Sequence, residues 1–239
     1  MTRKTLLITG ASAGIGAACA RLAAPDYDLY LNYRTDTAGA ETVRAYCEAA
    51  GATVTLLQAD VADPEAVAAM FARIPRLDCC INNAGIVGMT AKVSEYDHDR
   101  LRRMFDVNVI GAIMVARDAA AKMDRGGAIV NVSSAAARLG SANQYVDYAA
   151  SKAAVDTFTK GFADELARDG IRVMSVRPGL IDTELHAKGG EPGRAQRLAH
   201  MVPMGREASP EEVARPILFL LSDDASYMTG SAIEVTGGR

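Results

Sequence analysis

The chain has no tryptophan, five phenylalanines, three histidines and no long apolar run. A membrane-spanning helix needs about 18 consecutive apolar residues, and no segment approaches that length. The basic start, Met1 to Lys4, precedes the apolar run Leu6 to Ile8, but this run ends at Thr9 and is too short for an export signal. We therefore expect a cytoplasmic protein without a membrane segment.

A strong excess of charge of either sign is also absent. Lys and Arg number 26 and Asp and Glu number 29, which gives a formal net charge of −3. A nucleic-acid surface normally needs clustered basic residues, so we expect no nucleic-acid partner. Apolar residues make up 49% of the 239, and no Pro/Gly linker divides them. This composition predicts a single domain over residues 1–239.

Cysteine is scarce, and its spacing is uninformative for metal binding. The four cysteines are Cys19, Cys47, Cys79 and Cys80. They match neither a zinc-site spacing nor the disulfide framework of a small secreted domain. We expect reduced thiols in the core of a protein from a reducing compartment, and we predict no metal site.

Apolar segments of strand length alternate with segments of helix length. Strands are expected at 5–9, 29–33, 53–57, 77–81, 128–132, 172–176 and 232–235. Their apolar runs are continuous rather than alternating, which indicates a sheet covered on both faces. The predicted fold class is α/β with a doubly wound parallel sheet, in which ligands bind beyond the carboxyl ends of the strands.

One segment breaks this rhythm after the sixth strand. Residues 183–206 carry Gly189-Gly190, Pro192-Gly193 and Pro203 among scattered helix formers. Such a composition predicts a small mobile lid over a substrate site. An ordinary surface helix is the alternative.

A glycine-rich turn follows the first strand and leads into a helical pattern. Glycines allow a tight turn and close backbone approach, and the N-terminus of the following helix offers N–H groups to a pyrophosphate. Glycine-rich turns also occur for steric reasons alone, but the preceding strand and following helix favour a dinucleotide site. Its predicted cofactor-binding residues are Gly10, Ser12, Ala13, Gly14, Ile15 and Gly16.

The ends of the next strands bear on the choice of cofactor. Arg34 ends the second strand, where an acidic residue normally selects NAD and a cation suits the 2′-phosphate of NADP. Asp36 lies two residues further on, so NADP(H) is favoured and NAD(H) stays open. Asp60 and Val61 follow the third strand, where they are placed to hold an adenine. A polar turn after the fourth strand adds Asn83, Ala84 and Gly85.

A candidate catalytic group follows the fifth strand. Tyr148 and Lys152 lie four residues apart on a predicted helix and therefore share one face. We expect the Lys152 ammonium to lower the pKa of the Tyr148 phenol, which makes the phenol a general acid and base. The Ser134 hydroxyl is suited to hydrogen-bond the substrate oxygen as charge develops there. Tyr-x-x-x-Lys alone is frequent by chance on helices.

Together these motifs resemble the short-chain dehydrogenase/reductase family, over residues 4–238. The matching elements, in family order, are Thr9-Gly10-x-x-x-Gly14-Ile15-Gly16, Asp60, Asn82-Asn83-Ala84-Gly85, Asn108, Ser134, Tyr148-x-x-x-Lys152, Pro178-Gly179 and Thr183. The resemblance implies a Rossmann fold and, commonly, a homotetramer. Ser134 lies fourteen residues before Tyr148, one more than is usual in the family.

The resemblance also implies roles for individual residues. Lys152, besides acting on Tyr148, would hold the nicotinamide ribose. Asn108 would bind a water that links Lys152 to solvent as a proton relay. Ile181 and Thr183 would position the carboxamide of the cofactor, after Pro178 and Gly179.

The sequence thus predicts an NADP(H)-dependent oxidoreductase that interconverts a carbonyl and an alcohol on a small-molecule substrate. Tyr148 is its expected acid and base, with Ser134, Lys152 and Asn108 completing the catalytic set. A non-catalytic dinucleotide sensor on the same fold is the alternative, although such a sensor would typically lose Tyr148 or Lys152. The substrate stays open among 3-oxoacyl groups, sugars, steroids and small aldehydes.

Overall fold

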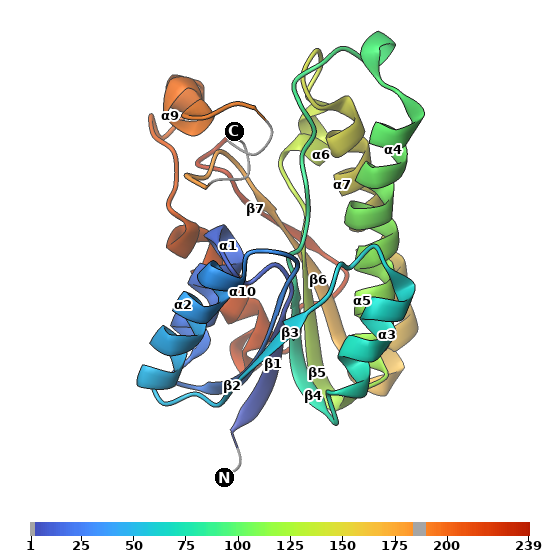
Figure 1. Ribbon diagram of the computed structural model, residues 1–239, viewed down its shortest axis with the longest axis vertical. Helices are drawn as coiled ribbons and strands as arrows, with labels where there is room; N and C mark the ends of the chain where they lie inside the picture. Colours follow the sequence, from blue (N-terminus) through green and yellow to red (C-terminus); the bar gives the residue numbers. More distant parts are fainter. Residues whose placement is uncertain (1–2, 184–189) are drawn as a thin grey trace.

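A parallel sheet of seven strands forms the centre of the protein, a computed structural model of which describes residues 3–183 and 190–239 (Figure 1). The strand order is β3-β2-β1-β4-β5-β6-β7, so the order reverses between β1 and β4. The strands are β1 (Lys4–Ile8), β2 (Tyr27–Tyr33), β3 (Val54–Gln58), β4 (Leu77–Asn82), β5 (Met123–Val132), β6 (Arg172–Pro178) and β7 (Ala232–Val235). The predicted doubly wound sheet is confirmed.

Each predicted strand is present, and the largest difference lies at the start of β5. We expected this strand to begin at Ala128, where the apolar run starts, but it begins at Met123. Met123 pairs with Leu77, and the register shifts before Cys79 pairs with Ala128. Backbone pairing therefore extends the strand through polar residues that hydropathy alone assigns to a loop.

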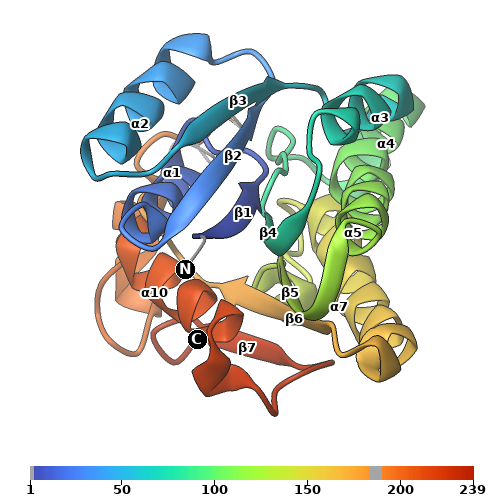
Figure 2. The same cartoon turned by 90° about the horizontal axis from the view of Figure 1, so that it is seen from below.

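Helices cover both faces of the sheet (Figure 2). The bounds are α1 (Gly14–Ala23), α2 (Thr37–Ala49), α3 (Pro64–Ala72), α4 (His98–Phe105), α5 (Ala112–Ala120), α6 (Ala136–Leu139), α7 (Val146–Leu166), α9 (Arg194–Leu198) and α10 (Pro210–Leu221). A π-helical segment spans Asp106–Gly111, and short 3-10 turns span Val93–Glu95, Ala167–Asp169, Ala199–Met201 and Asp223–Ala225. Figure 2 shows α1, α2 and α10 on one face and α3, α4, α5 and α7 on the other.

Alternation along the buried strands divides the core between the two faces. Leu6 and Ile8 of β1 pack in one cluster with α1 and α10, whereas Leu7 between them packs in the other. The adjacent Cys79 and Cys80 divide in the same way. All four cysteines are buried free thiols, and burial raises the pKa of Cys79 to about 11.

The described part of the chain contains neither a membrane-spanning helix nor a metal-binding cluster. No helix within 3–183 or 190–239 is long and apolar enough to cross a bilayer. Within the same ranges, no group of three or more His, Cys, Asp or Glu side chains is placed to hold a metal ion.

The predicted lid segment is described only in part. Residues 184–189 lie outside the described residues. From Gly190 onward the chain forms α9 and the 3-10 turn Ala199–Met201, and Arg194 of α9 hydrogen-bonds to Gln144 in the segment before α7. Helix α9 thus contacts the loop that precedes the Tyr148 helix, and its movement stays a prediction.

Candidate active site

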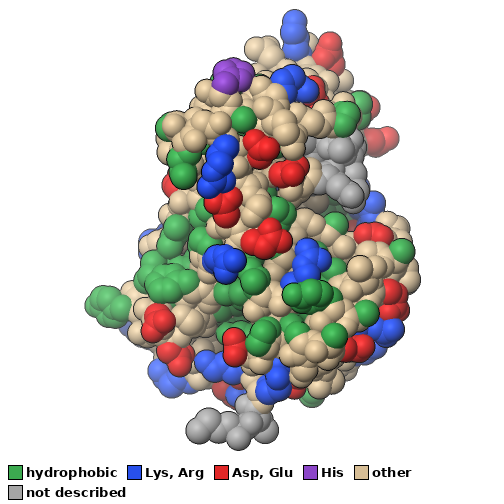
Figure 3. All heavy atoms as spheres, turned by 90° about the vertical axis from the view of Figure 1, so that its left-hand side faces the viewer, with side chains coloured by type: hydrophobic (Ala, Val, Ile, Leu, Met, Phe, Trp, Pro, Cys, Tyr) green, Lys and Arg blue, Asp and Glu red, His purple; other side chains and the backbone are tan. Residues whose placement is uncertain are grey.

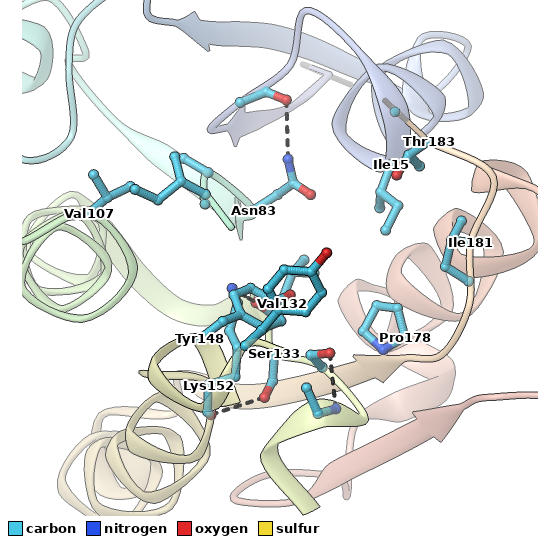
Figure 4. A pocket seen from close by; sticks show the side chains of 18 of the residues that line it. Ile15, Asn83, Val107, Val132, Ser133, Tyr148, Lys152, Pro178, Ile181 and Thr183 are labelled. Atoms are coloured by element: carbon cyan, nitrogen blue, oxygen red, sulfur yellow. Dashed lines mark hydrogen bonds between the residues drawn. The ribbon is translucent and has the colours of Figure 1, made fainter. Parts of the chain in front are cut away.

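A cavity of about 580 Å³ lies beyond the carboxyl ends of the strands. Residues one or two positions after the ends of six strands line it: Gly10, Arg34, Asp60, Asn83, Ser134 and Gly179. The structure brings all of the predicted site residues to this cavity except Gly16 and Asn108, which lie behind its wall. Figure 4 shows Ile15, Pro178, Ile181 and Thr183 on one side of it, facing Asn83, Val107 and Tyr148.

Close backbone packing explains the glycines after β1. Gly10 and Gly14 have φ values of +65° and +55°, a region that favours glycine. A Cβ on Gly16 would lie 2.3 Å from the Gly10 carbonyl oxygen, so Gly16 acts by letting the turn close on α1. Helix α1 begins at Gly14, and no side chain caps its N-terminus. Its first-turn N–H groups therefore remain available to an anion in the cavity.

Thr9 joins the glycine turn to the polar turn after β4. Its hydroxyl accepts hydrogen bonds from the backbone N–H of Asn83 at 2.9 Å and of Ala84 at 3.0 Å. The Asn83 amide in turn donates to the carbonyl oxygens of Thr9 at 2.9 Å and Gly10 at 3.1 Å (Figure 4). These bonds hold the two turns together at the point where the strand order reverses.

Charged side chains occupy the end of the cavity near β2. The Asp60 carboxylate accepts a hydrogen bond from Arg103 at 2.7 Å and lies 3.8 Å from an Arg34 nitrogen. Burial opposes ionisation, but bonds from Ala62 N–H and Arg103 hold the pKa of Asp60 below its usual range. Arg34 remains half exposed on the cavity wall. Sequence analysis did not identify Arg103, because its place beside Asp60 depends on how α4 packs.

Ser134 and Tyr148 meet near the end of β5. Burial raises the pKa of the Tyr148 phenol, and a hydrogen bond with the Ser134 side chain lowers it in part. The Ser134 oxygen accepts from the Ala136 N–H at 3.1 Å, which leaves its hydrogen to donate. Ser133 instead is buried and donates to the Lys152 carbonyl at 3.1 Å. Although Ser134 lies fourteen residues before Tyr148, Ser134 and not Ser133 reaches the phenol.

We expected the Lys152 ammonium to lower the pKa of the Tyr148 phenol, and this expectation was wrong. The Lys152 ammonium donates to the Val132 carbonyl at 2.8 Å and lies 5.7 Å from the centre of the Tyr148 ring. Desolvation of the buried phenol outweighs other influences on its pKa, so that pKa is raised and not lowered. Burial also lowers the pKa of Lys152 to about 8.

Asn108 lies in the π-helical segment and is buried behind the cavity wall. Its side chain accepts from the Ile86 N–H at 2.8 Å, and donates to the Ile86 carbonyl at 2.9 Å and the Ser151 hydroxyl at 3.1 Å. A Cβ on Gly85 would lie 3.3 Å from both the Asn108 oxygen and the Lys152 nitrogen. Gly85 therefore leaves a small gap between these two polar groups.

The loop expected to line a substrate pocket does so in part. Gln144 and Tyr145 line the cavity together with Ser141 and Ala142, whereas Asn143 does not. The cavity wall also includes Arg194 and Arg239, which sequence analysis missed. An arginine in a loop or short helix carries no pattern that predicts burial, so the fold alone reveals these two.

Several known proteins are similar to this chain over nearly its whole length. A family model described as enoyl-(acyl carrier protein) reductase matches residues 10–239. Escherichia coli (strain K12) has a protein called uncharacterized oxidoreductase YgfF that is 46% identical over 243 residues, or 98% of each chain. The 3beta-hydroxysteroid dehydrogenase 1 of Eggerthella lenta is 40% identical over 98% of this chain and 93% of its own.

A solved structure is similar over nearly the whole length. The crystal structure of a short chain dehydrogenase from Burkholderia cenocepacia J2315 in complex with NADP is 32% identical. It superposes with a TM-score of 0.92 and covers 98% of this chain and 97% of its own. The chain belongs to the short-chain dehydrogenase/reductase family and is an oxidoreductase.

Proposed function

We propose that the protein is an NADP(H)-dependent reductase that interconverts a carbonyl and an alcohol on a small molecule. The observation that carries the proposal is the meeting of Ser134 and Tyr148 on the cavity wall, with Lys152 buried beneath them. Reduction of a carbonyl group places negative charge on its oxygen. That oxygen then needs a hydrogen-bond donor, a proton donor and a nearby positive charge, which Ser134, Tyr148 and Lys152 supply.

The cavity fits a dinucleotide phosphate. The uncapped N-terminus of α1 and the glycine turn beside it form a site for a pyrophosphate. Arg34 and Arg103 supply two cations at the far end, where NADP carries its 2′-phosphate. The NADP complex of the Burkholderia cenocepacia relative supports the same cofactor. The carboxylate of Asp60 competes for both arginines, so NAD(H) remains the alternative.

In the reductive direction, the Ser134 hydroxyl donates a hydrogen bond to the carbonyl oxygen. The Tyr148 phenol transfers its proton to the same oxygen as negative charge develops there. NADPH, when bound, would supply a hydride to the carbonyl carbon, and this hydride carries both electrons of the reduction. The carbonyl thereby becomes an alcohol, with one hydrogen on carbon and one on oxygen.

The phenolate left on Tyr148 must regain a proton. Lys152 lies beside the ring, and its pKa of about 8 allows it to give and take a proton near neutral pH. Asn108 lies across Gly85 from Lys152, in a position to hold a water that connects the ammonium to solvent. The complete catalytic set and the oxidoreductases among the relatives favour an enzyme over a dinucleotide sensor.

The remaining parts of the proposal concern the whole molecule. We infer one cytoplasmic domain over residues 1–239, with the segment 183–206 as a lid over the substrate. We also infer a homotetramer, and exposed apolar side chains support it. These include Ile110, Ile113, Phe219 and Tyr227.

The test is oxidation of NADPH and NADH against ketones, aldehydes, sugars and 3-oxoacyl thioesters, with Tyr148→Phe assayed in parallel. We expect turnover with NADPH that the variant reduces by roughly a thousandfold, while cofactor binding persists. Turnover with NADH alone would contradict the proposed cofactor. Tight cofactor binding without any turnover would favour the sensor.

A further inference from the structure

Arg194 of α9 lies in the cavity wall and contacts the segment that leads into α7, the helix of Tyr148. Its side chain donates a hydrogen bond to the Gln144 side chain, and its guanidinium lies 5.2 Å from the centre of the Tyr145 ring. Tyr145 is the residue before α7 and precedes Tyr148 by three residues, about one helical turn. Arg194 is 8% exposed, so its charge is largely withdrawn from water.

Other arginines in this part of the fold have carboxylate partners. Arg197, on the same helix, pairs with Glu191, and Arg206 lies 2.6 Å from Glu212. Figure 3 shows acidic and basic side chains interspersed over the face that carries α9 and α2. Among the ion pairs of the described residues, none includes Arg194. Glu191 influences Arg194 electrostatically, but it binds Arg197 and Thr90.

The distribution of charge along the cavity is uneven. Its lining contains two acidic residues, Asp36 and Asp60, and both belong to the Arg34 end. The Asp36 side chain accepts from the Gly39 N–H at 3.0 Å as the cap of α2, and Asp60 binds Arg103. Away from the Arg34 end, the described lining therefore has the cations Lys152, Arg194 and Arg239 and no acidic side chain.

Within the described residues Arg194 has no carboxylate partner, and a buried guanidinium is costly unless a ligand supplies one. Gln144 occupies one of its nitrogens, and the remaining N–H donors have the planar fork that suits two carboxylate oxygens.

We propose that the substrate carries a carboxylate close to its reacting carbonyl and that Arg194 binds this carboxylate. The inference rests on the proposed function and names its substrate class: a short oxo acid in reduction, or the corresponding hydroxy acid in oxidation. With the carboxylate held by Arg194, the carbonyl oxygen lies toward Ser134 and Tyr148. Arg194 is thus a specificity-determining residue.

The experiment compares oxo acids with their methyl esters, which have the same carbonyl and no charge. The probes are 4-oxopentanoate, 5-oxohexanoate and 4-oxocyclohexanecarboxylate, each with its ester. NADPH-dependent turnover is measured for the wild type, Arg194→Gln and Arg194→Lys. Arg197→Gln, which changes an exposed arginine on the same helix, is the matched control.

We expect the wild type to prefer at least one acid to its ester by roughly ten- to a hundredfold in kcat/KM, the size of a hydrogen-bonded charge pair. Arg194→Gln should remove that preference by lowering kcat/KM for the acid far more than for the ester, while Arg194→Lys should keep part of the preference and Arg197→Gln all of it. Ester turnover that persists in the Gln variant shows that this variant is folded. Equal use of acids and esters by the wild type overturns the inference, and so does an equal loss of both in Arg194→Gln.

A binding measurement separates this inference from the proposed function. The oxo acids are titrated into the protein loaded with NADP⁺, where no hydride is available and binding alone is recorded by calorimetry. Tighter binding of an acid than of its ester, lost in Arg194→Gln, supports the carboxylate site even if no probe is turned over. An absence of turnover would then count against the catalytic proposal only, whereas equal binding of every acid and its ester overturns the carboxylate site.

Discussion

Arg100 on α4 binds the carboxylate of Asp147, the residue directly before Tyr148, through nitrogens at 2.7 and 3.3 Å. The Asp147 side chain is fully buried, and its carboxylate also accepts the Tyr148 backbone N–H at 2.9 Å. Arg100 further donates to the Met89 carbonyl at 2.7 Å. One guanidinium therefore ties α4 to the start of α7 and to the segment after β4.

Removal of Arg100 should destabilise the protein strongly. Arg100→Ala leaves the Asp147 carboxylate buried without a cation, and breaking a buried pair in this way costs about 3 kcal/mol or more. We expect a lower free energy of unfolding by urea denaturation and, because Asp147 adjoins Tyr148, a lower kcat. Arg102→Ala, at an exposed position of α4, is the control and should change neither by much. Equal stability of the two variants would mean that the pair is dispensable.

Burial of Lys152 predicts how stability depends on pH in the absence of cofactor. Its pKa is lowered to about 8, whereas in the unfolded chain it keeps the ordinary value near 10.5. Between these values the unfolded chain binds more protons than the folded one, so stability from this group rises with pH. The wild type should gain about 2 kcal/mol relative to Lys152→Met between pH 8 and 10. Parallel stability curves for the two proteins would refute the lowered pKa.

The strands of the sheet could be predicted well because each strand is signalled by residues that are neighbours in the sequence. Continuous apolar runs at β1 and β4 signal strands that are buried on both faces. The turn after β1 requires glycines because a Cβ there would clash with neighbouring atoms. The limits of β5 were less predictable, since pairing with Leu77 and not hydropathy decides where it begins.

Features that depend on packing could not be predicted in this way. The sequence places Tyr148 and Lys152 on one helix face, but the bond that holds Lys152 to Val132 comes from β5. For the same reason the sign of the shift in the Tyr148 pKa could not be obtained from spacing. The ion pair of Arg100 and the burial of Arg194 likewise join segments far apart in the chain.

Arg34 should control the choice between cofactors. If it binds the 2′-phosphate of NADP, Arg34→Ser removes a charge-assisted contact and should lower kcat/KM for NADPH by roughly ten- to a hundredfold. The value for NADH, which lacks that phosphate, should change little. The control is Arg76→Ser, which alters an exposed arginine paired with Asp78 and outside the cavity lining. A similar loss with both cofactors would assign Arg34 a structural role through Asp60.

Gly16 offers a test of the glycine turn itself. A Cβ at this position would lie 2.3 Å from the Gly10 carbonyl oxygen and 2.7 Å from the Asn83 amide nitrogen, so Gly16→Ala must push the turn away from α1. The expected result is a lower melting temperature without cofactor and a loss of most of the stabilisation that NADPH gives the wild type, since the N–H groups of α1 no longer meet the pyrophosphate. Thermal unfolding with and without NADPH separates these two effects. A variant that melts lower but keeps the full increment from NADPH would show that the turn supports the fold and contributes little to binding.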